Sequence, residues 1–256
     1  MKIKSASNNQ IKNWKKLRMS KYRKKEKLFF AEGLRCVEQI IENGIVSVDE
    51  LVIEEGFRDD ILKRISVPVY SVPKNEFSEL ADTDSPQGIL AVCREPEEAD
   101  PNVMANKSGL IVAFDAIQDP GNLGTMIRTA AWFGAAGLIY GAGTVQPFHP
   151  KVVRSTAGAT GAIPFMKGDH GPVLNRFEKQ GWKVCLLDGS ETSVNIQSYS
   201  PGEKTVLVIG NEGSGISREL FTPERTALRI PGNSRHVESL NAAVALSIGL
   251  YHFTND

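Results

Sequence analysis

Short apolar runs recur through the second half of the chain, and stretches with helical spacing separate them. The apolar runs cover residues 110–117, 137–141, 182–188, 205–210 and 228–232. The expected helices cover residues 125–135, 151–158, 173–180 and the stretch from 238 to the C-terminus. Runs that stay apolar without alternation are typical of strands buried on both faces. The pattern therefore predicts an α/β fold built on a parallel sheet.

A smaller α/β domain is expected before this sheet, over residues 28–95. Its pattern predicts a helix over 31–43 that stops at Gly44, strands over 48–56, 67–72 and 88–95, and a short helix over 59–65. Residues 96–107 are polar and without a period, so they are interpreted as a linker. The larger domain then covers residues 108–256.

The first 27 residues form a basic segment. The chain has 30 basic and 30 acidic residues, but eleven basic residues and one acidic residue lie in 1–27. The formal net charge of this segment is therefore +10, and that of the rest of the chain is −10. Ile11, Trp14, Leu17 and Tyr22 recur there at helical spacing, which predicts one amphipathic helix over 9–27. We interpret it as an arm that contacts phosphates; the alternative is a solvated surface helix.

Composition limits the cellular setting and the metal chemistry. Cys36, Cys93 and Cys185 are widely spaced and form no CxxC pair, which argues against a disulfide scaffold and a zinc site. No apolar run is long enough to span a membrane, and the basic N-terminus lacks the apolar stretch of a secretory signal. We expect a cytoplasmic protein without a metal or a membrane contact.

Three polar, glycine-rich loops directly follow predicted strands, over residues 119–124, 210–215 and 230–241. Ligands of parallel α/β sheets bind at the carboxyl ends of the strands, so these loops are the candidate site. The phosphate-binding pattern of nucleoside triphosphatases is absent. Gly141 and Gly143 lack the third glycine of a dinucleotide fingerprint, which leaves an NAD-dependent oxidoreductase as a weak alternative.

The three loops carry the motifs of a known family. They contain D-P-x-N-x-G-x-x-x-R-T-A over 119–130, I-G-x-E-G-x-G-I over 209–216, and I-P followed by E-S-L-N over 230–241. In this order they resemble the three motifs of the SpoU (TrmH) RNA methyltransferases of the SPOUT superfamily. The segment around residues 21–41 resembles the start of the ribosomal-protein-like substrate-binding domain of one branch of that family.

This resemblance implies a fold and an activity. The C-terminal part of the parallel sheet would be tied in a deep trefoil knot, the cofactor would be S-adenosylmethionine, and the protein would be a homodimer. The reaction would be methylation of a ribose 2′-hydroxyl in RNA, with ribosomal RNA as the expected substrate. The alternatives are a transfer RNA methyltransferase and a non-catalytic RNA-binding member of the same fold.

The resemblance also assigns roles to residues in the three loops. Arg128 would act on the ribose hydroxyl and its phosphate, and bidentate anchoring of the phosphate suits a guanidinium better than proton abstraction. Asn122 and Asn241 would donate and accept hydrogen bonds, Glu212 would orient Arg128 as a countercharge, and Ser239 would bond substrate or cofactor. Capping of a helix is the alternative role for Asn122 and Ser239. The cofactor contacts carried over are Gly210, Ile230, Leu240 and Leu187.

The third loop departs from the family pattern I-P-M-x-G. It is one residue longer here, and its glycine is Gly232. His236 lies in this longer loop, where a histidine is more often a surface or capping residue than a catalyst.

Overall fold

The computed structural model describes residues 3–233 and 235–254, so Lys2 of the basic segment and Ser234 of the third loop lie outside the described residues. The chain forms two compact units. The small unit comprises Met1–Glu97 and Gln146–Ala162, and the large unit comprises Glu98–Val145 and Ile163–Asp256. The chain therefore passes between the units three times, in contrast to the single passage that a linker over 96–107 implies.

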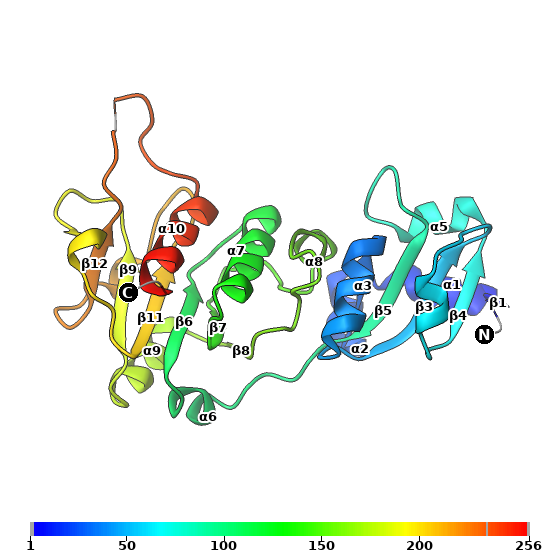
Figure 1. Cartoon of the computed structure of the whole chain (residues 1–256), viewed down its shortest axis with the longest axis horizontal. Coiled ribbons are helices and arrows are strands. Elements are labelled where there is room, and N and C mark those ends of the chain that lie inside the picture. The colour runs from blue at the N-terminus through cyan, green and yellow to red at the C-terminus, as the bar shows by residue number, and fades with distance from the viewer. Residues whose placement is uncertain (1–2, 234, 255–256) are drawn as a thin grey trace. The chain divides into compact units, whose positions relative to one another are not determined.

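A seven-stranded sheet forms the centre of the large unit (Figure 1). Its order is β10-β12-β9-β11-β6-β7-β8, and every neighbouring pair is parallel. The strands are β6 (Gly109–Phe114), β7 (Gly137–Tyr140), β8 (Phe165–Lys167), β9 (Lys183–Leu187), β10 (Val194–Asn195), β11 (Lys204–Ile209) and β12 (Thr226–Arg229). The predicted parallel sheet is confirmed. The short edge strands β8 and β10 add to it, and the trefoil knot stays a prediction.

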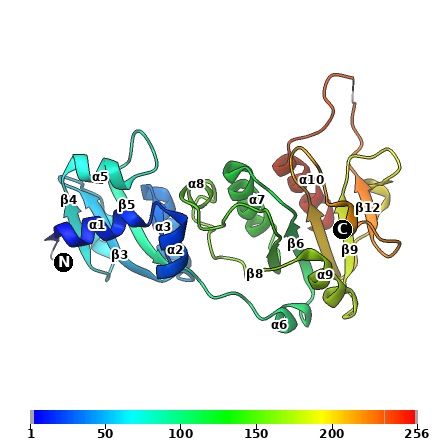
Figure 2. The same cartoon turned by 180° about the vertical axis from the view of Figure 1, so that it is seen from behind.

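Helices cover both faces of this sheet. On one face lie α7 (Pro120–Trp132) and α10 (Ala242–Thr254), which run side by side in Figures 1 and 2. Gly249 of α10 approaches the sheet so closely that an added Cβ would lie 3.1 Å from Leu207 and 3.2 Å from Leu187. The other face packs against α6 (Pro101–Ala105), α9 (His170–Glu178) and the 3₁₀ turn η2 (Arg218–Leu220). A second 3₁₀ turn, η1, covers Ile196–Ser198.

The small unit contains a mixed sheet of order β1-β4-β3-β5-β2. Its strands are β1 (Lys4–Ser5), β2 (Leu28–Glu32), β3 (Val48–Glu54), β4 (Val69–Val72) and β5 (Ile89–Arg94). Strand β2 differs from the sequence-based expectation, which left residues 28–30 unassigned and began a helix at 31. Residues 28–32 instead pair antiparallel with β5, and Gly33, at φ +92°, turns the chain into the helix that follows.

Two of the helices of the small unit, α1 (Asn8–Lys16) and α2 (Ser20–Glu26), lie in the basic segment. The others are α3 (Leu34–Asn43), α4 (Ile61–Arg64), α5 (Lys74–Leu80) and α8 (Pro150–Ser155). The single helix expected over 9–27 is broken, because Met19 is extended and caps α2. Ile11, Trp14 and Leu17 are buried in a core with residues of α5 and the sheet. The basic segment is thus packed into the small unit along α1.

Residues 146–162 belong to the small unit, although the sequence places them inside the larger domain. Cys36 of α3 lies with its Sγ 3.8 Å from the Val153 carbonyl oxygen, and the Asn43 amide donates to the Gly158 carbonyl at 3.1 Å. At Gly158 an added Cβ would lie 2.3 Å from the Gln39 Cβ. This close packing onto α3 explains why residues 146–162 lie in the small unit. The contacts join residues that are far apart in the sequence, so the predicted boundaries missed them. Across the described ranges, no helix is long and apolar enough to cross a membrane.

Candidate active site

The three sequence loops meet at one edge of the seven-stranded sheet. The register places Ile209 of β11 beside Phe114 of β6 on one side and Leu187 of β9 on the other, and Leu187 lies beside Leu228 of β12. Because these strands are parallel, their carboxyl ends lie together, and the loops that follow them emerge at the same edge.

The first loop leads directly into α7, and Asp119 caps this helix. Its side chain accepts a hydrogen bond from the Asn122 backbone N–H at 2.7 Å, and Pro120 occupies the first helical turn, where its missing N–H costs nothing. The capping role considered for Asn122 is therefore filled by Asp119. The Asn122 side chain is left for another contact, and its amide donates to the Glu212 carboxylate at 3.0 Å.

Asn241 joins the same hydrogen-bonded chain from the third loop. Its side-chain oxygen accepts from the backbone N–H groups of Ala243 and Val244, so Asn241 caps α10. Its amide nitrogen then donates to the Asn122 side-chain oxygen at 3.0 Å. The result is a directed chain, from Asn241 to Asn122 to Glu212, that links all three motifs.

Two side chains that the sequence reasoning missed hold the loops against each other. The Asn211 amide donates to the Ala116 carbonyl at 2.8 Å, while its oxygen accepts from the Gly213 N–H at 2.9 Å. The buried Asp115 carboxylate accepts from the Ser217 N–H at 2.7 Å. Ala116 has φ +54°, a conformation that costs a non-glycine residue energy, and these bonds hold it in place. The signal for both residues was a polar side chain directly after a buried strand.

Arg128 lies two turns into α7 and is exposed. In the part of the chain that the structure describes, its guanidinium forms no ion pair or hydrogen bond. The expected countercharge, Glu212, instead accepts hydrogen bonds from the Asn122 amide and, at 3.5 Å, from the Gln118 N–H. Arg128 is therefore a cation without a countercharge among the described residues, on the same helix as Asn122.

Ser239 lies in the exposed third loop and caps no helix, since α10 begins at Ala242 after its cap Asn241. His236 is exposed in the same loop. Neither side chain forms a hydrogen bond with another described residue. The structure thus joins Asn122, Glu212 and Asn241 by hydrogen bonds and does not join Ser239 to them.

The four residues assigned to the cofactor fit an adenosine-containing ligand in their chemistry. Leu187 is buried at the end of β9, Ile230 directly follows β12, and Leu240 is 46% exposed in the third loop. Gly210 is buried at the turn after β11, where an added Cβ would lie 2.4 Å from the Gly215 carbon. Apolar side chains and loop backbone at one sheet edge are the groups that hold a nucleoside. Within the ranges described, no group of three or more His, Cys, Asp or Glu residues is placed to hold a metal ion.

Comparison with known proteins agrees with this geometry. Residues 109–251 match the model of the SpoU rRNA Methylase family, and residues 8–91 match the MRM3-like substrate binding domain. The chain belongs to the SpoU rRNA methylase family. This membership confirms the resemblance seen in the motifs and removes the oxidoreductase alternative.

Relatives of this SpoU methylase are similar over nearly their whole length. The chain is 35% identical to the 23S rRNA (guanosine(2553)-2′-O)-methyltransferase RlmP of Bacillus subtilis, covering 98% of both chains. Among solved structures, an AdoMet-bound rRNA methyltransferase from Sinorhizobium meliloti has a TM-score of 0.82 and 28% identity, covering 98% of this chain and 96% of that one. AviRb from Streptomyces viridochromogenes, in complex with AdoMet, has a TM-score of 0.85 and 25% identity, covering 96% and 97%.

Proposed function

We propose that this protein transfers a methyl group from S-adenosylmethionine to a ribose 2′-hydroxyl of 23S ribosomal RNA. The observation that carries the proposal is the chain from Asn241 through Asn122 to Glu212, together with the unpaired Arg128 on the helix that carries Asn122. Similarity to RlmP over nearly the whole of both chains supports the choice of 23S ribosomal RNA.

Arg128 anchors the RNA in this proposal. A guanidinium presents parallel N–H donors that match two oxygens of a phosphate, and it stays protonated at any physiological pH. Because no acidic side chain of the described residues neutralises it, Arg128 is available to the phosphate beside the target ribose. Fixing that phosphate aligns the 2′-hydroxyl and stabilises the negative charge that develops on its oxygen. The new O–C bond would form as the C–S bond of the cofactor breaks, with S-adenosylhomocysteine as the leaving group and the hydroxyl proton released to water.

The asparagine–glutamate chain completes the polar side of the site. Glu212 keeps the Asn122 amide oriented, and Asn241 fixes the Asn122 oxygen from the other side. These groups supply donors and acceptors in one rigid arrangement, which costs no reorganisation during the reaction. Ser239 lies two residues before Asn241 and is assigned to bonding substrate or cofactor.

Leu187, Gly210, Ile230 and Leu240 hold the cofactor in this proposal. S-adenosylmethionine supplies an electrophilic methyl group when it is bound. The three apolar side chains and the loop backbone around Gly210 bind its adenosine and exclude water from it. The small unit binds RNA, and its N-terminal basic segment contacts RNA phosphates. Residues 28–95 of the small unit are assigned to RNA binding, and methyl transfer is assigned to the part of 108–256 that forms the large unit.

Methyl transfer tests this directly. The purified protein is incubated with tritiated S-adenosylmethionine and protein-free 23S ribosomal RNA, 16S ribosomal RNA or total transfer RNA, and the product nucleotide is identified by mass spectrometry. Label in the 2′-O-methylnucleoside fraction of 23S RNA supports the proposal. Label in transfer RNA alone favours the transfer RNA alternative, and RNA binding without transfer favours the non-catalytic one.

We further propose that the protein is a homodimer joined through α7 and α10. Trp132 is 85% exposed, and Val244, Ile248 and Tyr251 are exposed on α10. An apolar patch of this kind on adjacent helices is typical of a protein interface. Sedimentation velocity should show a dimer that dissociates in Trp132→Lys and persists in Val103→Lys, which changes an exposed valine of α6. A monomeric wild-type protein would contradict this.

A further inference from the structure

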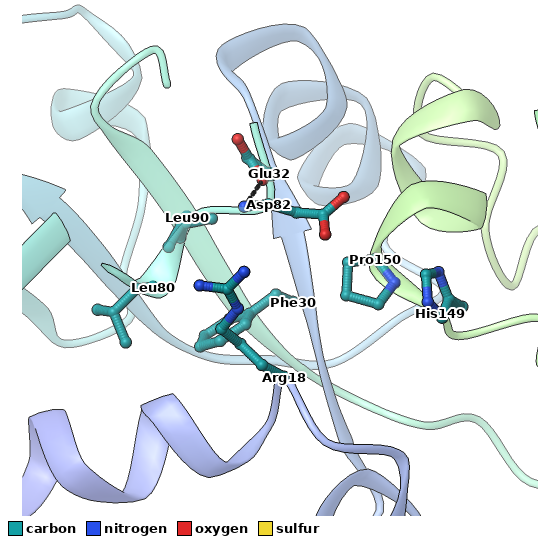
Figure 3. A pocket seen from close by; sticks show the side chains of 8 residues that line it. All are labelled: Arg18, Phe30, Glu32, Leu80, Asp82, Leu90, His149 and Pro150. Atoms are coloured by element: carbon teal, nitrogen blue, oxygen red, sulfur yellow. Dashed lines mark hydrogen bonds between the residues drawn. The ribbon is translucent and has the colours of Figure 1, made fainter. Parts of the chain in front are cut away.

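A cavity in the small unit is not used by the proposed chemistry (Figure 3). Its volume is about 100 Å³, less than that of a pocket for a drug-sized ligand, and it opens to solvent. Its lining comes from segments far apart in the sequence: Arg18, Phe30, Glu32, Leu80, Asp82, Leu90, His149 and Pro150.

The cavity combines apolar walls with two charged groups on different sides. Phe30, Leu80 and Leu90 are buried members of the small-unit core. Figure 3 shows the Arg18 guanidinium and the Asp82 carboxylate extending into the cavity from separate segments. These two groups are not paired with each other among the described residues, since the Arg18 guanidinium donates to the Glu79 carbonyl at 2.7 Å and Asp82 pairs with Arg154 at 2.8 Å.

The other polar side chains of the lining, Glu32 and His149, each have hydrogen-bond partners in the small unit. Glu32 is buried and accepts from the Asp82 N–H at 2.7 Å and from the Thr83 hydroxyl. The His149 Nδ1 accepts from the Lys151 N–H at 3.2 Å. Arg18 keeps N–H donors, and Asp82 keeps one carboxylate oxygen, without a partner among the described residues, and both line the same cavity.

The balance of charge selects the kind of ligand. The guanidinium groups of Arg18 and Arg154 offset the carboxylates of Glu32 and Asp82, so the cavity favours a neutral occupant and opposes a phosphate. A neutral, flat molecule with apolar faces and an edge that carries both donors and acceptors fits this lining. RNA-binding modules recognise unstacked bases in this way, by contact with the base faces and hydrogen bonds to the base edge.

We propose that this cavity binds one unstacked nucleobase of the RNA substrate, with Arg18 donating to an acceptor on the base edge and Asp82 accepting from an N–H. The proposal rests on the proposed function, because it takes RNA as the substrate of the small unit. It assigns the small unit a role in reading the RNA in addition to electrostatic attraction.

The Asp82→Asn variant distinguishes a base from a phosphate by the sign of its effect. If Asp82 accepts from a base, losing the carboxylate weakens RNA binding about tenfold, as expected for one lost hydrogen bond to a charged group. If the RNA backbone lies there instead, removing a negative charge strengthens RNA binding. Filter binding to protein-free 23S ribosomal RNA measures either outcome and does not depend on methyl transfer.

The Arg18→Gln variant supplies the second measurement. A base contact predicts a similar loss of affinity with an unchanged slope of log affinity against log salt, whereas a phosphate contact flattens that slope by about 0.7 to 0.9. Glu55→Gln and Arg58→Gln are the matched controls, because they make the same charge changes at exposed positions of the same unit outside the cavity.

The two proposals fail in different ways. Tighter binding by Asp82→Asn, a flatter salt slope for Arg18→Gln, or affinities equal to those of the controls would overturn the nucleobase site while methylation continues. Absence of methyl transfer by the wild-type protein would instead overturn the proposed function. Thermal melting and the affinity for S-adenosylmethionine, both expected to be unchanged, confirm that each variant is folded.

Discussion

The Asn241 side chain links the start of α10 to the Asn122 side chain through a hydrogen bond of 3.0 Å. Because the Asn241 oxygen is occupied by the first N–H groups of α10, its nitrogen must face Asn122. The Asn122 oxygen then faces Asn241, and its nitrogen faces the Glu212 carboxylate. The cap of α10 thus fixes the orientation of the Asn241 and Asn122 amides.

Asn241→Asp should separate this role from helix capping. Aspartate caps a helix as well as asparagine, so the melting temperature should change little. Its carboxylate would however face the Asn122 oxygen without a donor, which should lower kcat for 23S RNA at least about tenfold. Asn241→Ser, which caps without reaching Asn122, should lose similar activity. Normal turnover by Asn241→Asp would show that the directed chain is not needed.

The location of the site could be predicted from the sequence because parallel strands bring their carboxyl ends together. Asn122, Glu212 and Asn241 are far apart in the chain, yet each follows a buried strand, and the register makes them neighbours. Pairwise contacts within the loops were less predictable. Opposite charge suggested a pair between Glu212 and Arg128, but the Asn122 amide takes the carboxylate.

The docking of residues 146–162 could not be predicted from the sequence. Their helical spacing is compatible with several partners, and the one they contact, α3, lies about a hundred residues earlier. The basic segment has the same ambiguity, because a lysine-rich amphipathic helix can pack its apolar side or bind elsewhere. In the structure the helix packs its apolar side into the small-unit core around Trp14, whose indole also donates to Glu50 at 2.6 Å.

Replacement of Arg128 should abolish methyl transfer without loss of the cofactor. Arg128→Ala should lower kcat/KM for RNA about 100-fold or more, the usual effect of losing a donor to developing negative charge. Arg128→Lys should also be poor, since a point charge lacks the planar fork. Calorimetry should find the S-adenosylmethionine affinity within about twofold of wild type, as in the control Arg176→Ala on exposed α9 surface. Near-normal turnover by Arg128→Lys would rule out bidentate anchoring.

Gly210 should tolerate no side chain, in contrast to Gly232 in the third loop. A Cβ at Gly210 would lie 2.4 Å from backbone atoms of Gly215 and Ile216, which cannot move without opening the loop. Gly210→Ala should destabilise the protein by about 1–3 kcal/mol and weaken cofactor binding. Gly232 has nothing within 4 Å, so Gly232→Ala should behave like wild type. Thermal melting and calorimetry measure both, and equal cofactor affinity in the two variants would contradict the assignment of Gly210.

His149 should make the protein sensitive to mild acid. Burial, followed by the charge of Arg23, lowers the pKa of His149 below its ordinary value. Since the unfolded state takes up the proton first as pH falls through about 6.5, unfolding becomes easier below that pH. His149→Asn keeps an acceptor for the cap of α8, and its stability should fall less between pH 7.5 and 5. The control His236→Asn, in the exposed third loop, should retain the wild-type dependence of stability on pH. Urea unfolding, followed by circular dichroism at each pH, measures the stability of all three proteins.

The lysines of α1 and α2 should set the salt dependence of RNA binding. Deleting the segment is unsuitable as a test, because it would remove Trp14 and its neighbours from the core. Lys15 is also unsuitable, since it pairs with Glu76 at 2.6 Å and Glu79 at 2.7 Å. Four exposed lysines of α1, α2 and the residue that caps α2 form no ion pair with another described residue: Lys12, Lys21, Lys24 and Lys27.

Changing these four lysines to glutamine should raise the KM for RNA and leave S-adenosylmethionine binding unchanged. Each phosphate contact that is lost should flatten the slope of log affinity against log salt by about 0.7 to 0.9. The control makes the same change in charge at exposed lysines elsewhere, at Lys74, Lys107, Lys179 and Lys183. If both quadruple variants flatten the slope equally, net charge explains the attraction. If neither does, the lysines of α1 and α2 form only a solvated surface, and RNA is held by other residues.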